Sequence, residues 1–192
     1  MNTKTLSTRA LNTIDQYLHF KVGNASCSIP YFNNKTLKAR GALSAYIGKG
    51  SPKEIVNEVQ AISVKAHVDT NAFTDESLKK LLVDSNIGID CSGLSYYILN
   101  AENEELGKGS LDKHLSFVQS KGFFAKIISS LRSSFRPIEN TGVRTLADEK
   151  NSNIIPLNEI KPGDMVTMLD GPDGNDRNHI LIIHQVDPLN YR

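Results

Sequence analysis

The sequence has no tryptophan, only two cysteines among 192 residues, and no excess of either charge. Without tryptophan it lacks the side chain best suited to stacking on sugars. Lys and Arg number 22 and Asp and Glu number 21, which gives a formal net charge of +1. Binding to nucleic acid or to an anionic membrane surface usually requires an excess of positive charge, which this sequence does not have. We therefore expect neither as a partner.

Long apolar runs are also missing. No run is long enough to cross a membrane, and residues 1–9 lack the apolar core of a signal peptide. We therefore expect no membrane span and a chain that is soluble as encoded, either cytoplasmic or exported or released by an unidentified route. With 39% hydrophobic residues, the chain is long enough for one globular domain with a real core. Its oligomeric state is left open.

Helix start signals recur in the N-terminal half. Ser7 or Thr8 can cap a helix that continues to about residue 20, with Leu18 on its apolar face and Tyr17 as a further candidate for that face. A capping box begins at Ser51, with proline at the first helical position, and predicts a helix to about residue 66. A further start at Thr74 predicts a short helix. This half of the chain is therefore expected to be helical.

The C-terminal half has a different pattern. The polar, glycine-punctuated residues 100–109 predict a loop, and an apolar stripe in residues 123–135 predicts a helix. A tight turn at residues 161–164 precedes a strand at 165–169, and a polar connection at 171–176 leads to a second strand at 178–186. Helices followed by antiparallel strands predict the α+β class.

Cys91 combines a preceding turn with a following helix. Gly88 and Asp90 end an extended approach, and apolar residues such as Leu94 and Ile98 recur at helical spacing after it. Exposed N–H groups and the helix dipole would there favour a thiolate over a thiol. Most free cysteines are small core hydrophobes. A buried structural cysteine needs no Asp before it and no Ser-Gly after it, so we interpret Cys91 as a nucleophile.

Asp-Cys-Ser-Gly-Leu at residues 90–94 resembles the nucleophile motif of the NlpC-type cell-wall cysteine peptidases, a circularly permuted branch of the papain-like fold. Pro-Gly-Asp followed by an apolar strand, at residues 162–169, is similar to the segment that begins that family's catalytic sheet. The resemblance implies one papain-like catalytic domain over residues 1–192. Its nucleophile would lie on a central helix packed on a C-terminal antiparallel sheet, with helical insertions as departures from the family pattern.

In that family the general base is a histidine that opens the strand after the Pro-Gly-Asp strand, and His179 matches that position. An imidazole within hydrogen-bond reach can take the thiol proton and later give it to the leaving amine. His184 would lie about 16 Å further along the same expected strand and on its other face. Both histidines cannot serve Cys91 directly, and we choose His179.

The resemblance also implies a polar residue that orients the base, on a strand that would follow Arg192. Either this group comes from elsewhere, with Asn178, His184 and Gln185 as candidates, or the sequence is a fragment that lacks its last strands. Tyr31, in an upstream aromatic loop, is similar to the family tyrosine whose hydroxyl helps to stabilise the oxyanion. Asp90 and Ser92, which flank Cys91, are further candidates for orienting or oxyanion roles.

Two cysteines are enough for one disulfide. A disulfide would, however, prevent Cys91 from acting as a nucleophile, so we expect Cys27 and Cys91 to be free. Neither has a Cys or His neighbour at metal-ligand spacing. The acidic loop 170–176 invites a calcium interpretation but lacks the rest of any recognised calcium loop. We expect neither a metal nor a cofactor.

For function, the resemblance implies a cysteine peptidase that hydrolyses an amide bond through a thioester. The expected substrate is a peptide, most often a peptidoglycan stem peptide containing D-amino acids, and the process would be cell-wall degradation. Two alternatives stay open. The Cys91–His179 pair could serve an acyltransferase or thioesterase, or the domain could be a catalytically inactive binding module.

Overall fold

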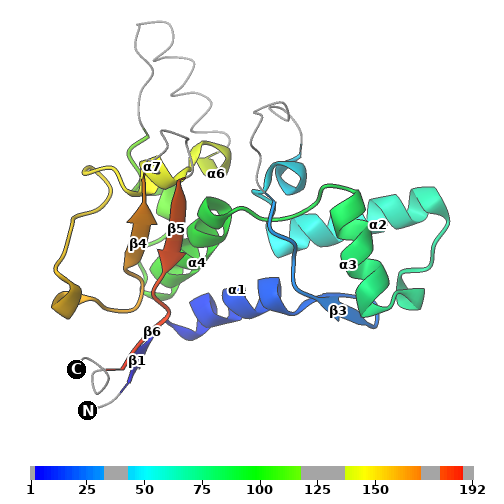
Figure 1. Ribbon diagram of the computed structural model, residues 1–192, viewed down its shortest axis with the longest axis horizontal. Coiled ribbons are helices and arrows are strands. Elements are labelled where there is room, and N and C mark those ends of the chain that lie inside the picture. The colour runs from blue at the N-terminus through cyan, green and yellow to red at the C-terminus, as the bar shows by residue number, and fades with distance from the viewer. Residues whose placement is uncertain (1–2, 33–42, 118–136, 170–177, 188–192) are drawn as a thin grey trace, which may run out of the picture. The chain divides into compact units, whose positions relative to one another are not determined.

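The computed structural model describes residues 3–32, 43–117, 137–169 and 178–187. These residues form helices and short antiparallel strands, which confirms the α+β class (Figure 1). They divide into two compact units, and we describe each by itself. The helical unit comprises residues 12–94, and the sheet unit comprises the described parts of 1–11 and 95–192. A single catalytic domain over residues 1–192 stays a prediction.

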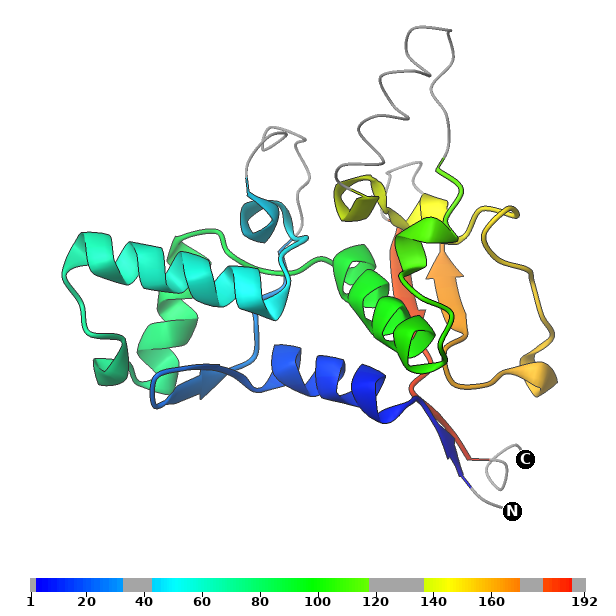
Figure 2. The same cartoon turned by 180° about the vertical axis from the view of Figure 1, so that it is seen from behind.

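The helical unit contains helices α2 (Pro52–Ala66) and α3 (Asp75–Asp84) and a hairpin of strands β2 (Phe20–Val22) and β3 (Ala25–Cys27). In the hairpin Phe20 pairs with Cys27, and β3 lies next to α3 whereas β2 lies next to α2 (Figure 2). Two 3₁₀ helices, Ser44–Ile47 and Thr70–Ala72, complete the unit. Its core is apolar and fully buried, with Ile55, Val59, Leu78 and Leu82 as members.

Local capping explains where these helices begin. The Ser51 hydroxyl accepts a hydrogen bond from the Glu54 N–H (3.2 Å), and the Glu54 carboxylate accepts one from the Ser51 N–H (2.7 Å). Thr74 and Ser77 exchange the same pair of bonds at the start of α3. Each cap satisfies N–H groups that have no partner inside the helix. Both predicted helices are therefore confirmed.

Helix α1 (Thr8–Leu18) and helix α4 (Cys91–Glu105) each contribute residues to both units. Ser7 caps α1, since its hydroxyl accepts a hydrogen bond from the Ala10 N–H (3.3 Å). The expectation that Leu18 belongs to the apolar face is wrong, because this side chain is exposed. Tyr17 is buried instead, and its hydroxyl donates to the Gly50 carbonyl (3.0 Å).

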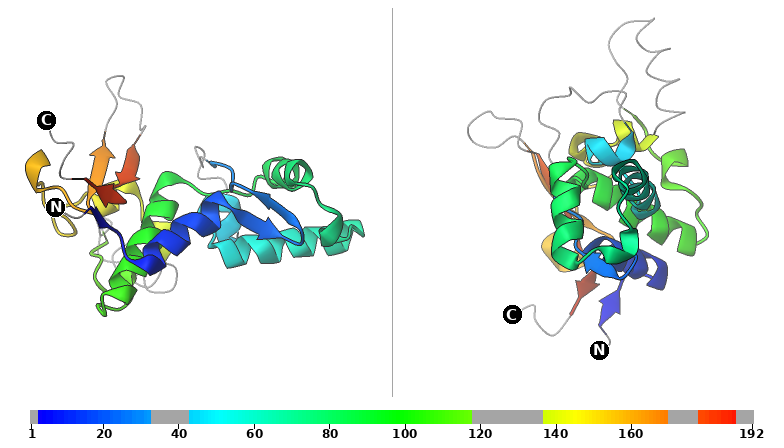
Figure 3. Two further views of the ribbon diagram at one scale, coloured as in Figure 1. Left: turned by 90° about the horizontal axis from the view of Figure 1, so that it is seen from below. Right: turned by 90° about the vertical axis from the view of Figure 1, so that its right-hand side faces the viewer.

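Among its described residues, the sheet unit contains two antiparallel strand pairs. Strand β4 (Met165–Met168) pairs with β5 (His179–Ile182), and β1 (Lys4–Thr5) pairs with β6 (Gln185–Val186) (Figure 3). Short helical elements lie between α4 and β4 in sequence. They are the helices α6 (Pro137–Asn140) and α7 (Val143–Leu146) and the 3₁₀ helices Leu111–Lys113 and Leu157–Glu159. The predicted turn before β4 is confirmed, since the Asp164 N–H donates to the Lys161 carbonyl (3.1 Å) and its carboxylate accepts from the Lys161 N–H (2.8 Å).

Two predicted boundaries in this unit are wrong. Residues 100–109 are not all loop, because α4 continues to Glu105. Asn100 anchors the loop that follows α4, since its side-chain oxygen accepts from the Leu111 N–H (2.8 Å). The strand expected at 178–186 is also interrupted. Its first part pairs with β4, and its last part pairs with β1.

The helix expected at 123–135 and the connection at 171–176, with its calcium candidates, lie outside the described residues. None of the helices within the described ranges has the length and apolar character needed to span a bilayer.

Candidate functional site

Two segments flank the chain on its approach to Cys91 in the helical unit. On one side, the Ile89 N–H donates to the Pro30 carbonyl and the Ile89 carbonyl accepts from the Phe32 N–H, both at 3.0 Å. On the other side, the Asp90 N–H donates to the Gly48 carbonyl (2.9 Å), and Lys49 pairs with Ile89 as an antiparallel bridge. The backbone before the cysteine is thus fixed from both sides.

Glycines make this close approach possible. A Cβ atom at Gly88 would lie 2.5 Å from the Pro30 carbonyl oxygen, and one at Gly93 would lie 2.5 Å from the Gly48 carbonyl oxygen. Gly48 itself has a φ of 74°, a conformation that residues with side chains rarely adopt. The glycines around the cysteine are therefore required by sterics.

Helix α4 begins at Cys91, which confirms the predicted position at a helix start. Asp90 is the residue before the helix. Its carboxylate accepts from the Gly93 N–H (2.6 Å), and its carbonyl accepts from the Leu94 N–H (3.0 Å). This is the bonding of an N-cap. Cys91 is a free, partly exposed thiol at the positive end of a 15-residue helix.

Lys49 is a member of this site that the sequence analysis did not identify. Its ammonium group lies 3.0 Å from the Asp90 carboxylate and 2.6 Å from the Ser92 hydroxyl, which in turn donates to the same carboxylate oxygen (3.0 Å). Ser92 is buried, and Lys49 is only 6% exposed. The glycines on either side of Lys49 indicate a tightly packed stretch of backbone. Nothing in this local sequence indicates that Lys49 pairs with Asp90 and Ser92, which lie far along the chain.

Tyr31 lies beside the segment that leads to Cys91, with its backbone bridged to Ile89, and its hydroxyl is near enough to Cys91 for the two groups to interact electrostatically. Partial burial raises the pKa of this hydroxyl, and the neighbouring Cys91 and Asp90 raise it further. The hydroxyl therefore keeps its proton at neutral pH and can act as a hydrogen-bond donor. Because the side chain is 61% exposed, a bound molecule can reach it.

His179 is the first residue of β5 in the sheet unit and pairs with Met168. Residues two apart in a strand share a face, so His179 lies on the same face as the exposed Leu181, opposite to Ile180. Ile180 is 3% exposed and belongs to the core. The imidazole is thus on the open face of the hairpin. Cys91 and His179 belong to different units, and their pairing stays a prediction.

The other candidates near His179 differ in position. Asn178 directly precedes β5. His184 lies between β5 and β6, is exposed, and accepts a hydrogen bond at its carbonyl from the Leu6 N–H (2.9 Å). Gln185 belongs to β6 and pairs with Thr5. Since the chain changes strand partner after Ile182, the 16 Å spacing expected along one continuous strand does not apply.

Cys27, the second thiol, is also free and half-buried in β3. Burial raises the pKa of this thiol, Lys79 partly opposes that effect, and Asp75 adds to it. Among the described residues, no group of three or more His, Cys, Asp or Glu side chains is arranged to hold a metal ion.

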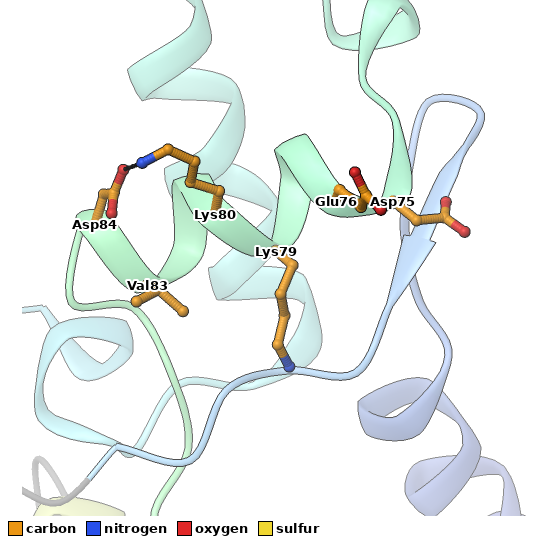
Figure 4. Close-up of a pocket in the computed structure, with 6 residues that line it drawn as sticks. All are labelled: Asp75, Glu76, Lys79, Lys80, Val83 and Asp84. Carbon is orange, nitrogen blue, oxygen red and sulfur yellow. Dashed lines mark hydrogen bonds and ion pairs between the residues drawn. The ribbon is translucent and has the colours of Figure 1, made fainter.

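A shallow hollow on α3 does not include Cys91 or His179 in its lining (Figure 4). Most of its polar side chains are already paired: the Lys79 ammonium donates to the Ser28 carbonyl (2.6 Å), and Lys80 forms an ion pair with Asp84 (2.6 Å). Asp75 accepts from the Ser26 N–H (2.7 Å). The hollow therefore has no chemistry comparable with that around Cys91.

No protein-family model, no curated protein and no solved structure matches this chain.

Proposed function

We propose that the protein is a cysteine hydrolase of the NlpC-type, papain-like family, with Cys91 as nucleophile and His179 as general base. The substrate is an amide bond in a peptide, and a peptidoglycan stem peptide fits the resemblance best. The observation that carries the proposal is Cys91 itself. It opens a capped helix of 15 residues and has the protonated hydroxyl of Tyr31 as a neighbour.

The surroundings of Cys91 match what nucleophilic catalysis needs. The N–H groups in the first turn of a helix and its dipole stabilise negative charge, which favours a thiolate. The first-turn N–H groups that the Asp90 cap does not use, together with the Tyr31 hydroxyl, would be the donors for the oxyanion that forms when a carbonyl is attacked. The backbone bonds of Ile89 and Asp90 hold the cysteine in place before any substrate binds.

In the proposed reaction, the Cys91 sulfur attacks the carbonyl carbon while the thiol proton passes to the His179 imidazole. The C–N bond then breaks, and His179 returns that proton to the leaving amine. Water attacks the resulting thioester while giving one proton to His179. The C–S bond then breaks, His179 returns the proton to the Cys91 sulfur, and the acid product leaves. This requires the imidazole to come within about 3 Å of the sulfur or of the attacking water.

Mass spectrometry of stem peptides incubated with the full chain tests the proposal. We expect the wild type and a Cys27→Ser control to release two fragments from the peptide. Cys91→Ala should abolish cleavage, and His179→Ala should lower turnover by on the order of a hundred-fold or more. His184→Ala should retain most activity, because His184 lies outside β5.

The same digest separates the alternatives. An acyltransferase would attach the acyl fragment to an added amine or alcohol, and a binding module would retain the intact peptide without cutting it. Cleavage that survives Cys91→Ala would overturn the nucleophile assignment. A loss on His184→Ala but not on His179→Ala would move the base to His184.

A further inference from the structure

Lys49 is almost completely buried, yet it carries a charged group. Burial of a lone ammonium is unfavourable, so such a group is retained where a carboxylate and further acceptors compensate it. Here the Asp90 carboxylate at 3.0 Å and the Ser92 hydroxyl at 2.6 Å fill that role. Both partners are sequence neighbours of Cys91.

Asp90 has opposing effects on the cysteine. As N-cap it stabilises the first turn of α4 through the Gly93 N–H. As a carboxylate next to Cys91, it also places a negative charge close to the position where a thiolate would form, and a like charge disfavours the ionised form. A compensating positive charge would keep the benefit of the cap and remove its electrostatic cost.

We propose that Lys49 is a positioning residue for Cys91: it offsets the charge of the Asp90 cap and, through Ser92, fixes the first turn of α4, so that the thiolate can form. The inference rests on the proposed function only for its role in turnover. Its effect on the thiol is independent of any substrate. Among the described residues, the titratable groups near this turn on the neighbouring segments are Tyr31 on one side and Lys49 on the other, with Asp90 on its own segment.

The experiment measures the rate of iodoacetamide alkylation of Cys91 against pH in the full chain, with each labelled peptide quantified by mass spectrometry. Lys49→Met keeps the length and shape of the stem but removes the charge. We expect it to move the midpoint of the Cys91 profile up by about one pH unit and to slow labelling at pH 7 about ten-fold. Lys49→Arg, which keeps the charge, should leave the midpoint near that of the wild type.

Asp90→Asn provides the complementary change, because asparagine still caps a helix but carries no charge. We expect Asp90→Asn to move the midpoint in the opposite direction and the double variant Lys49→Met, Asp90→Asn to return it close to the wild type. If Lys49→Met alone does not fold, the comparison of Asp90→Asn with the double variant isolates the same loss of charge.

A matched control comes from the other thiol in the helical unit. Burial raises the pKa of Cys27 and Lys79 partly opposes that rise, so Lys79→Met should move the Cys27 profile to still higher pH and leave the Cys91 profile in place. Lys49→Met should do the reverse. A folded Lys49→Met protein whose Cys91 profile is unchanged would overturn the proposal, as would equal shifts at both thiols. A shifted profile without peptide cleavage would instead overturn the proposed function and leave this inference intact.

Discussion

Cys27 and Cys91 share a unit but differ in what surrounds the sulfur. Burial raises the pKa of Cys27, whereas Cys91 lies at a helix N-terminus. We therefore expect iodoacetamide to label Cys91 at least about ten-fold faster than Cys27 at pH 7 in the folded protein. Because the folded pKa of Cys27 is raised, its labelling should begin at higher pH than in the urea-unfolded chain. Equal rates at the two thiols in the folded protein would count against the nucleophile.

The hydroxyl of Tyr31 provides a second test on a single residue. If it donates to the oxyanion, Tyr31→Phe should lower kcat about ten- to a thousand-fold and leave KM nearly unchanged, because the donor acts mainly in the transition state. Tyr46→Phe is the matched control, since Tyr46 lies in the same unit and its hydroxyl bonds to Glu58 (3.0 Å). Equal losses in the two variants would point to a general effect on folding.

Among the helices, α2 and α4 are both capped, but the two caps differ in their partners. Ser51→Ala removes a partly exposed cap and should lower the free energy of unfolding by about 1 kcal/mol. Asp90→Ala removes a cap and also removes the carboxylate that pairs with the buried Lys49 at 3.0 Å, so we expect a larger loss, about 2–4 kcal/mol. Urea unfolding followed by circular dichroism measures both. A smaller loss for Asp90→Ala would contradict the buried pair.

Sequence patterns predicted those elements that depend on near neighbours. The caps at Ser51 and Thr74 and the start of α4 at Cys91 could be predicted because their signals lie within one turn of helix. Where a partner lies far along the chain, prediction failed. The link from Lys49 to Asp90 and the change of strand partner after Ile182 both depend on tertiary pairing. The length of α4 was underestimated because polar residues near its end are good helix formers.

At the scale of the whole molecule, the proposed catalytic pair draws one residue from each unit. Cys91 belongs to the helical unit and His179 to the sheet unit, and the proposed reaction requires both at the same scissile bond. Each partner is locally suited to its role: the cysteine opens a capped helix, and the histidine lies on the open face of the β4–β5 hairpin.

The proximity of Cys91 to position 179 can be measured directly with dibromobimane, a reagent that becomes fluorescent when it links two nearby thiols. In a Cys27→Ser background, the His179→Cys variant should form a bridge between position 179 and Cys91, identified by the mass of the linked peptides. The matched His184→Cys variant should form little or none, because His184 lies beyond β5. Efficient bridging from position 184 but not from position 179 would contradict the central claim that Cys91 and His179 form one catalytic pair.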